Sequence, residues 1–116
     1  MGATKKHFYQ EEQLTFSSLF KALGHPARIT IVQMLSNQRN LNCTDLQKEI
    51  KLSLPSISRH CQVLHRCGII GYEVIDSNCF YHLDNHLLDR ITDYIDTINI
   101  ERPSITGQVY YPTVRH

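Results

Sequence analysis

The chain has 116 residues, which is enough for one domain with a modest hydrophobic core. Hydrophobic residues make up 41% and charged residues 20%, a composition that favours a globular protein over a disordered one. The formal net charge of +1 does not indicate a nucleic-acid partner, so a DNA-binding surface would need local clustering of lysine and arginine. No apolar run approaches the length of a membrane span, and the polar N-terminus is not typical of a signal peptide; we therefore expect a cytoplasmic protein without membrane contact.

The first helix is predicted to follow a flexible N-terminus over residues 1–10. From about Glu11, apolar residues recur with the spacing of one helix face, and Gly24 is suited to end the helix. The apolar positions are Phe16, Leu19, Phe20 and Leu23.

A second helix is predicted to begin at Pro26, a residue that suits the first turn of a helix. Its apolar content is too broad for a surface helix, so we expect it to form the buried centre of the domain. The apolar residues are Ile29, Ile31, Val32, Met34 and Leu35. A polar loop is expected over residues 36–40.

Two short helices joined by a tight link then predict a helix-turn-helix. The first is expected to be capped by Thr44 and to contact the core through Leu46 and Ile50. The second is predicted to run from an N-cap at Ser53 to a stop at Gly68, which can adopt the left-handed conformation past a helix end.

The second helix of this pair has two contrasting faces. An apolar stripe is formed by Ile57, Cys61 and Leu64. The opposite face carries Pro55, Arg59, Gln62 and Arg66. Such a helix suits a DNA major groove, because arginine can meet phosphate or guanine and glutamine can meet base edges. An ordinary amphipathic surface helix is the alternative interpretation.

The hydrophobic period then changes from that of a helix to that of a strand. Residues 70–75 and 79–83 alternate, and the turn formers Asp76, Ser77 and Asn78 separate them. A β-hairpin directly behind a helix-turn-helix is a wing. The predicted fold is therefore a winged helix-turn-helix, mainly α, with five helices and a two-stranded hairpin.

The last helix is predicted from about Asn85 to Glu101, where Pro103 stops it. Its apolar stripe is Leu87, Ile91, Tyr94, Ile95 and Ile98. Because the earlier helices already form a core, this stripe is expected to meet a partner chain. We thus expect one DNA-binding and dimerisation domain over residues 11–101, followed by a C-terminal extension over residues 102–116 that is either an extended arm or disordered.

Three passages resemble the ArsR-type family of bacterial winged-helix repressors, in the order that the family has them. Residues 19–29 resemble the family's alanine-leucine-x-x-proline-x-arginine passage, residues 53–64 its recognition helix, and residues 67–70 the glycine and aliphatic pair before its wing. The resemblance covers roughly residues 14–98. It implies a homodimer formed by the first and last helices, with two recognition helices reading a palindromic operator in double-stranded DNA.

Site residues follow from this resemblance and from the two helix faces. The expected DNA-binding residues are Ser53, Pro55, Ser56, Ser58, Arg59, His60, Gln62 and Arg66. Arg59 is the best single candidate, whereas Arg66 at the far end of the helix is better placed for phosphate than for bases. Ser53 could serve only as a cap, and His60 only as a structural histidine. The expected dimer residues are Phe16, Leu19, Leu87, Ile91, Tyr94, Ile95 and Ile98.

The wing departs from the family pattern. Many relatives carry arginine or lysine at its tip, where this chain has Asp76, Ser77 and Asn78, with Glu73 nearby. Because negative charge repels phosphate, we expect the wing to contribute less to DNA binding than in those relatives.

A sensor site, as the family often carries, is only half supported. The Cys-x-Cys of the third helix would fall on Asn42 and Thr44, with Cys43 out of register. The other metal site of the family would use Asp84 and His86, but its later pair falls on Thr97 and Ile100, which do not ligate zinc. We therefore expect no cofactor and favour capping of the last helix by Asp84; zinc at Asp84 and His86 is the alternative interpretation.

The four cysteines, at 43, 61, 67 and 79, form no CxxC pair and are expected to be free thiols in a reducing cytoplasm. Cys61 is expected to be a small buried hydrophobe, and thiol sensing stays open.

The function that this pattern favours is a sequence-specific transcriptional repressor. Two alternatives stay open: a metal- or thiol-responsive repressor with a non-standard sensor site, and a winged helix that binds another protein. An enzyme is not expected, since the sequence contains no glycine-rich phosphate loop and no nucleophile elbow. These patterns do not predict the operator sequence, the regulated genes or the effector.

Overall fold

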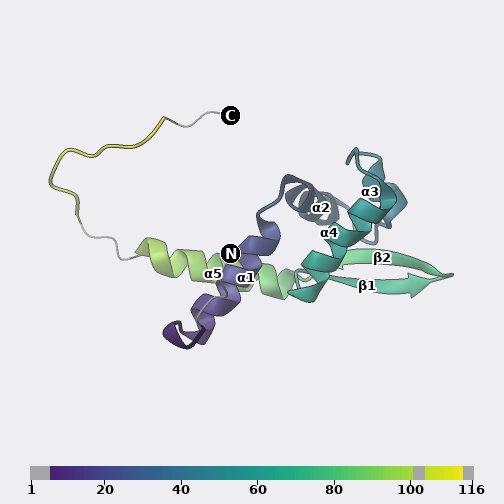
Figure 1. Ribbon diagram of the computed structural model, residues 1–116, viewed down its shortest axis with the longest axis horizontal. Helices are drawn as coiled ribbons and strands as arrows, with labels where there is room; N and C mark the ends of the chain where they lie inside the picture. The colour runs from purple at the N-terminus through teal and green to yellow at the C-terminus, as the bar shows by residue number, and fades with distance from the viewer. Residues whose placement is uncertain (1–5, 101–103, 114–116) are drawn as a thin grey trace.

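The computed structural model describes residues 6–100 and 104–113 (Figure 1). Five α-helices and one antiparallel hairpin follow a short 3₁₀ turn at Lys6–Phe8. The elements are α1 (Glu11–Leu23), α2 (Pro26–Asn37), α3 (Cys43–Gln47), α4 (Leu54–Arg66), β1 (Ile70–Ile75), β2 (Asn78–Leu83) and α5 (Asn85–Ile100). The predicted winged helix-turn-helix, with five helices and a two-stranded wing, is confirmed. No helix in the described ranges has the length and apolar content needed to cross a membrane.

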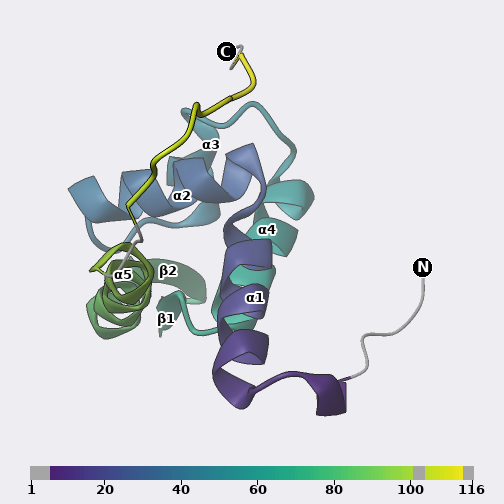
Figure 2. The same cartoon turned by 90° about the vertical axis from the view of Figure 1, so that its left-hand side faces the viewer.

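The core is built around α4, which packs against α1, α2, α3 and β1 (Figures 1 and 2). Each of these helices turns one apolar face inward, as the helical period of the sequence predicts. The most deeply buried side chains are Ile31, Leu46, Ile57, Cys61, Leu64, Ile69 and Ile70. The predicted core contacts of the helix-turn-helix, Leu46 and Ile50, are both buried.

The buried face of α2 is narrower than predicted. Ile31 and Leu35 are buried and Val32 and Met34 partly so, but Ile29 is 46% exposed. Placing Ile29 in the core was wrong, because the residues that enter it are one helical turn apart at Ala27, Ile31 and Leu35, and Ile29 points away from that line. The helix also runs to Asn37, so the polar loop that follows is shorter than the expected 36–40.

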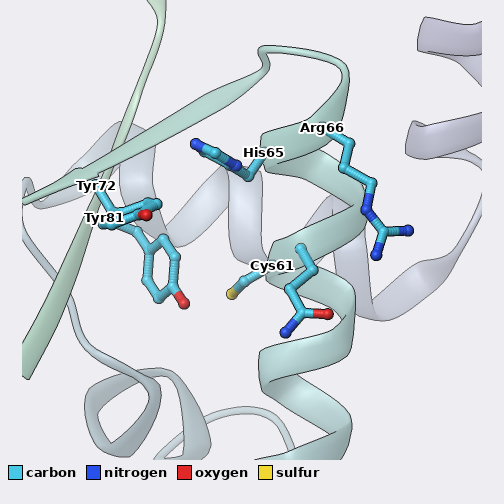
Figure 3. A pocket seen from close by; sticks show the side chains of 6 residues that line it. Cys61, His65, Arg66, Tyr72 and Tyr81 are labelled. Atoms are coloured by element: carbon cyan, nitrogen blue, oxygen red, sulfur yellow. The ribbon is translucent and has the colours of Figure 1, made fainter.

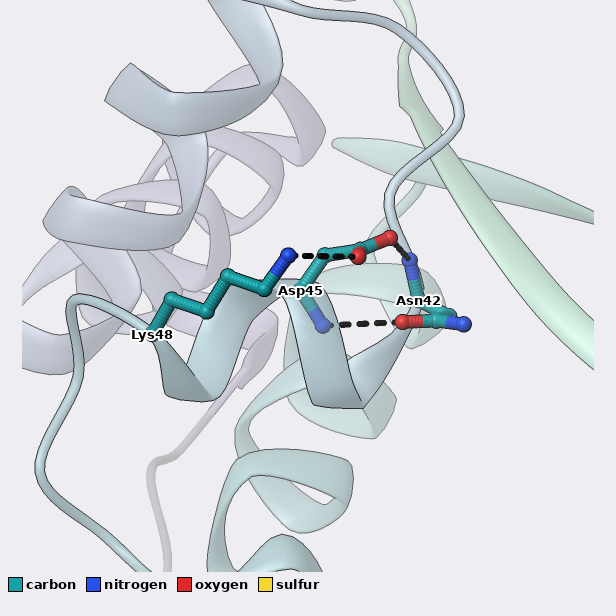
Figure 4. A network of polar contacts seen from close by, with 3 residues as sticks. All are labelled: Asn42, Asp45 and Lys48. Atoms are coloured by element: carbon teal, nitrogen blue, oxygen red, sulfur yellow. Dashed lines mark hydrogen bonds and ion pairs between the residues drawn. The ribbon is translucent and has the colours of Figure 1, made fainter.

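The cap of α3 is Asn42 and not Thr44, which corrects the prediction. The Asn42 side chain accepts a hydrogen bond from the Asp45 backbone nitrogen (2.8 Å), and the Asp45 carboxylate accepts one from the Asn42 nitrogen (3.0 Å; Figure 4). This reciprocal capping box satisfies two N–H groups that the helix leaves unpaired. The ion pair between Lys48 and Asp45 (3.7 Å) lies on the solvent side of the same turn.

Both ends of α4 follow the sequence prediction. Ser53 Oγ accepts a hydrogen bond from the Ser56 nitrogen (3.3 Å), and Pro55 lies in the first turn, where its missing N–H costs nothing. After Cys67 the chain turns at Gly68 with φ of 84°, a left-handed conformation that a side chain would strain.

The wing pairs β1 with β2 from Ile70↔Leu83 to Ile75↔Asn78. At its tip, Asp76 and Ser77 both adopt positive φ, as residues in a tight hairpin turn do. At its base, Leu41 and Tyr81 exchange two backbone hydrogen bonds (2.8 and 3.3 Å), which attach the segment before α3 to β2. Beyond α5, residues 104–113 form no helix or strand and extend away from the helices, with Tyr110 and Tyr111 exposed (Figure 1).

Candidate nucleic-acid interface

The two faces of α4 separate as the sequence predicts. Ile57, Cys61 and Leu64 have no solvent exposure. Pro55, Arg59, Gln62 and Arg66 are exposed on the other side of the helix, while Ser56, Ser58 and His60 are partly exposed between the two faces. The structure therefore brings Pro55, Arg59, Gln62 and Arg66 together on one exposed face of α4, with Ser56, Ser58 and His60 at its edges.

Arg59 is held in place by hydroxyl groups at the start of the helix. Its Nη2 donates to Ser56 Oγ (3.2 Å), and Ser53 Oγ donates to that same oxygen (3.0 Å). Ser53 thus both caps the helix and belongs to this network, so the two interpretations of that residue are compatible. The described residues form a single ion pair, between Lys48 and Asp45. Arg59 therefore has no carboxylate partner among them. Its charge is available for an external anion.

His60 faces α2. Its ring lies 4.4 Å from the ring of His25, centroid to centroid. Burial, together with the charges of His25, Arg28 and Arg59, lowers the pKa of His60 below its usual 6.5. His25 itself caps α2, because its Nδ1 accepts a hydrogen bond from the Ala27 nitrogen (3.0 Å). His25 could not be predicted as a neighbour of α4, since nothing in the local sequence indicates this contact.

Gln62 and Arg66 border a small pocket of about 110 Å³ between α4 and the wing (Figure 3). The His65 ring packs against Tyr72 of β1 (4.9 Å between centroids), which in turn approaches Tyr81 of β2 (6.2 Å). These ring contacts attach the C-terminal half of α4 to the wing, so the helix and hairpin form one surface.

Cys43, Cys61 and Tyr81 form a cluster where α3, α4 and β2 meet, and this cluster was not predicted from the sequence. The hydrogen bond from Cys61, with a second from Tyr81, lowers the pKa of the Cys43 thiol to about 7. The same bond, together with burial, raises the pKa of Cys61, while burial raises that of Tyr81. The three residues come from α3, α4 and β2, and the Leu41–Tyr81 bridge brings them together, so no sequence spacing could have indicated them.

The wing tip carries no basic side chain. Glu73, Asp76, Ser77 and Asn78 are all exposed there. Residues 70–83 contain two acids and neither lysine nor arginine, so the hairpin presents negative rather than positive charge.

The candidate metal ligands lie in places that do not favour a site. Asp84 Oδ1 accepts a hydrogen bond from the Leu87 nitrogen (3.0 Å) and so caps α5, as the favoured alternative predicted, while His86 is exposed. Asn42 is engaged in the cap of α3, and Thr97 donates to the Tyr94 carbonyl oxygen (2.7 Å). The described part of the chain contains no group of three or more histidine, cysteine or acidic side chains placed to hold one ion. Asp84, His86, Asn42 and Thr97 therefore do not fit the metal sites of the family that the sequence resembles.

The candidate dimer residues divide into two groups. Phe16, Leu19 and Leu87 are buried in the chain's own core, and Phe16 stacks on Tyr94 with ring centroids 4.0 Å apart and planes 6° from parallel. Ile91 and Tyr94 are partly buried. Further along α5, Ile95 is 40% exposed and Ile98 58% exposed, and both are free to meet another surface.

Comparison with known proteins agrees with the fold and with the helix-turn-helix. Residues 25–72 match the family model described as bacterial regulatory protein, arsR family. An uncharacterized HTH-type transcriptional regulator of Methanocaldococcus jannaschii is 26% identical over 82 residues, which is 71% of this chain and 92% of that protein.

Two solved structures share the architecture. An ArsR-like transcriptional regulator from Rhodococcus sp. RHA1 superposes with a TM-score of 0.69 at 19% identity, covering 78% of this chain and 84% of that one. The homodimeric winged helix-turn-helix DNA-binding domain Mb0332 from Mycobacterium bovis does so with a TM-score of 0.63 at 14% identity, covering 84% and 88%. Residues 25–72 are thus similar to the ArsR family of bacterial regulatory proteins, and the chain has a winged helix-turn-helix fold.

Proposed function

We propose that the chain acts in the cytoplasm as a repressor, and that a homodimer binds a palindromic operator through its two α4 helices. The observation that carries this proposal is the state of Arg59. It is exposed on the outward face of α4, oriented by Ser56 Oγ, and without a carboxylate partner among the described residues. An arginine that is pre-oriented and uncompensated suits bidentate binding of guanine or phosphate.

The other residues of α4 take roles that follow from their places on the helix. Ser53, Pro55 and Ser56 at the N-terminal end approach the phosphates that flank the groove, where helix N–H groups also favour anions. Ser58 and Gln62 offer hydrogen bonds to base edges, and His60 contacts the backbone when protonated. Arg66, at the far end of the helix, binds phosphate.

The wing contributes little in this proposal. Asp76 and Glu73 place negative charge on the hairpin, and phosphate would repel both. Affinity therefore depends on α4 more heavily than in a regulator whose wing carries basic residues.

The proposed dimer uses the exposed part of the α5 stripe. Ile95 and Ile98 supply apolar surface that the single chain leaves uncovered, next to the aromatic contact of Phe16 with Tyr94. Phe16, Leu19 and Leu87 would support this surface from behind, since they are already buried within one chain. The homodimeric M. bovis domain of the same fold supports this assignment.

The test compares Arg59→Ala with Arg39→Ala on an operator selected from random duplex DNA. His25, which packs on His60 of α4, precedes the first residue of α2, whereas Arg39 follows the last residue of that helix. Arg39 therefore lies at the end of α2 that is distant from this contact with α4, and it serves as a charge-matched control. Loss of Arg59 should weaken specific binding by about 1–3 kcal/mol, and the selected sequence should be an inverted repeat. The control should bind like the parent protein.

Equal operator affinity of Arg59→Ala and the parent would contradict the assignment of this face. If a dimeric preparation selected no DNA from the pool, the chain would instead be a winged helix that binds another protein.

A further inference from the structure

A second open cavity lies on the flank of α4 that faces away from the wing. It measures about 500 Å³ and lies between α1, the start of α2 and the C-terminal half of α4. These three helices pack against one another (Figure 2). Its volume is within the range of small-molecule sites, about 300–1,000 Å³. None of the residues in the Arg59 network lines it.

The cavity is cationic from three sides. Lys21 comes from α1, Arg28 from α2 and Arg66 from α4. None of the three forms an ion pair with any of the described acidic residues. Three uncompensated positive charges around one small volume favour an anion there.

Arg28 also shows a local shortage of hydrogen-bond acceptors. Its Nη1 donates to the carbonyl oxygens of Ala22 (3.0 Å) and Lys21 (3.4 Å) at the end of α1, but its Nε is buried and has no acceptor among the described residues. A buried donor without a partner carries a desolvation penalty. An anionic ligand that entered beside this guanidinium would offset that penalty.

The rest of the lining is small and apolar. Ala22 is buried at the floor, Val63 of α4 is partly buried, and Ser18 is exposed at the rim. An inorganic anion would leave this floor uncovered, whereas a ligand with an apolar body would cover it. The lining thus selects for a molecule with one charged end and one apolar end.

We propose that this cavity binds a small organic anion with an apolar body, such as a medium-chain carboxylate. The carboxylate pairs with Lys21, Arg28 and Arg66, and the apolar body lies against Ala22 and Val63. On α1, Ser18 and Ala22 point away from Phe16 and Phe20, the side chains that face α5, so the cavity stays open in the proposed dimer.

Occupancy of the cavity is coupled to DNA binding through α4, which supplies Val63 and Arg66. A ligand that binds Arg66 prevents this side chain from binding phosphate, so it lowers the affinity for DNA. By thermodynamic reciprocity, bound DNA lowers the affinity of the cavity for the ligand. This coupling rests on the proposed function; the ligand site itself does not, because it is tested without DNA.

The test uses sodium octanoate, with 1-octanol as the uncharged probe and octylamine as the probe of opposite charge. Titration of the full chain, followed by amide NMR, should move the signals of Ser18, Ala22 and Val63 with octanoate. The two other probes should bind at least about tenfold more weakly, because only the anion meets the three cations.

Variants separate the cavity from the DNA surface. Lys21→Glu should weaken octanoate at least about tenfold, whereas the charge-matched Arg39→Glu should not. Ser18→Trp, a rim substitution that fills the cavity without touching the core, should abolish octanoate binding and leave operator binding intact. Arg59→Ala should weaken operator binding and leave octanoate binding unchanged.

Three results would overturn the proposal. Octanoate could move no cavity signals, or bind no better than 1-octanol, or bind equally well to Lys21→Glu. A fourth outcome would assign the three cations to DNA: operator duplex moves the Ser18 and Val63 signals while octanoate does not.

Discussion

The thiol of Cys61 on α4 donates a hydrogen bond to the sulfur of Cys43 on α3, and this bond joins the two helices of the helix-turn-helix. Cys61 has no solvent exposure, whereas Cys43 is partly exposed as the first residue of its helix. The donated bond stabilises the thiolate of Cys43 and lowers its pKa to about 7. At neutral pH, Cys43 is therefore the thiol of this pair that reacts, and Cys61 is the one that supports it.

The first prediction concerns the reactivity of Cys43. Alkylation by iodoacetamide, measured by mass spectrometry across a pH series, should reach half of its maximal rate near pH 7 at this residue. Cys61→Ala removes the donor, so the pKa of Cys43 should rise and the midpoint should move to higher pH. Cys61→Ser keeps a donor and should keep the midpoint low.

Cys67→Ala is the matched control, because the Cys67 thiol donates to the Leu64 carbonyl oxygen (3.4 Å) rather than to Cys43. An unchanged midpoint in Cys61→Ala would show that the bond between the two thiols does not set the pKa of Cys43.

The second prediction concerns the His25–His60 pair. The pKa of His60 should lie below 6.5 in the free protein, chiefly through burial and then through the charge of His25. His25→Asn removes that charge and keeps a capping side chain for α2, so the pKa of His60 should rise but stay below 6.5. The Cε1 proton of His60, followed by NMR through the acid range, reports this value.

The lowered pKa of His60 also determines how the free energy of unfolding changes with pH. A histidine whose pKa is lower in the folded than in the unfolded state makes folding less favourable as pH falls below the unfolded pKa. The free energy of unfolding should therefore decrease from pH 7 toward pH 5, and less steeply in His25→Asn. If the pKa of His60 were the same in the variant, the charge of His25, whose ring lies 4.4 Å away, would not contribute to lowering it.

The third prediction tests the cap of α3. Asn42→Ala should destabilise the domain by about 1 kcal/mol, because the helix loses one accepted bond and the reciprocal one is weakened. Thr44→Ala should change the free energy of unfolding by no more than a few tenths of a kcal/mol, since Thr44 lies inside the helix. Urea unfolding of both variants decides between them, and a larger loss in Thr44→Ala would restore the cap that the sequence analysis predicted.

What could be predicted from the sequence was mostly local. Ser53, Pro55 and Gly68 mark the ends of α4 because a cap, a first-turn proline and a left-handed glycine act within a few residues. The inward stripe of Ile57, Cys61 and Leu64 follows from the helical period alone, so the candidate DNA surface on its other side could be predicted as well.

What could not be predicted depended on contacts between distant segments. Asn42 and Thr44 are both good caps, and the choice between them is set where Leu41 pairs with Tyr81 of the wing. Ile29 is as apolar as Ile31, but only the packing of α2 on α4 decides which of them is buried. The Cys43–Cys61 bond and the cavity between α1 and α4 arise from the same long-range packing.

The last prediction concerns the dimer. Ile98 is 58% exposed on α5, so replacing it costs the single chain little, but a charge there would lie within the proposed interface. Ile98→Glu should therefore weaken dimerisation by at least about 2 kcal/mol, as expected for an interface anchor, while the folded variant keeps the helical circular dichroism of the parent. Sedimentation velocity across a concentration series gives the dissociation constant.

Ile29→Glu is the matched control, since Ile29 is a comparably exposed isoleucine, 46% accessible, on α2 rather than α5. It should sediment as the parent does at every concentration. If Ile98→Glu also sedimented like the parent, the exposed stripe of α5 would not be the dimer surface. Operator binding would then have to be explained without the two-fold symmetry that pairs one α4 with another, because the spacing of two half-sites is set by the dimer that presents the two helices.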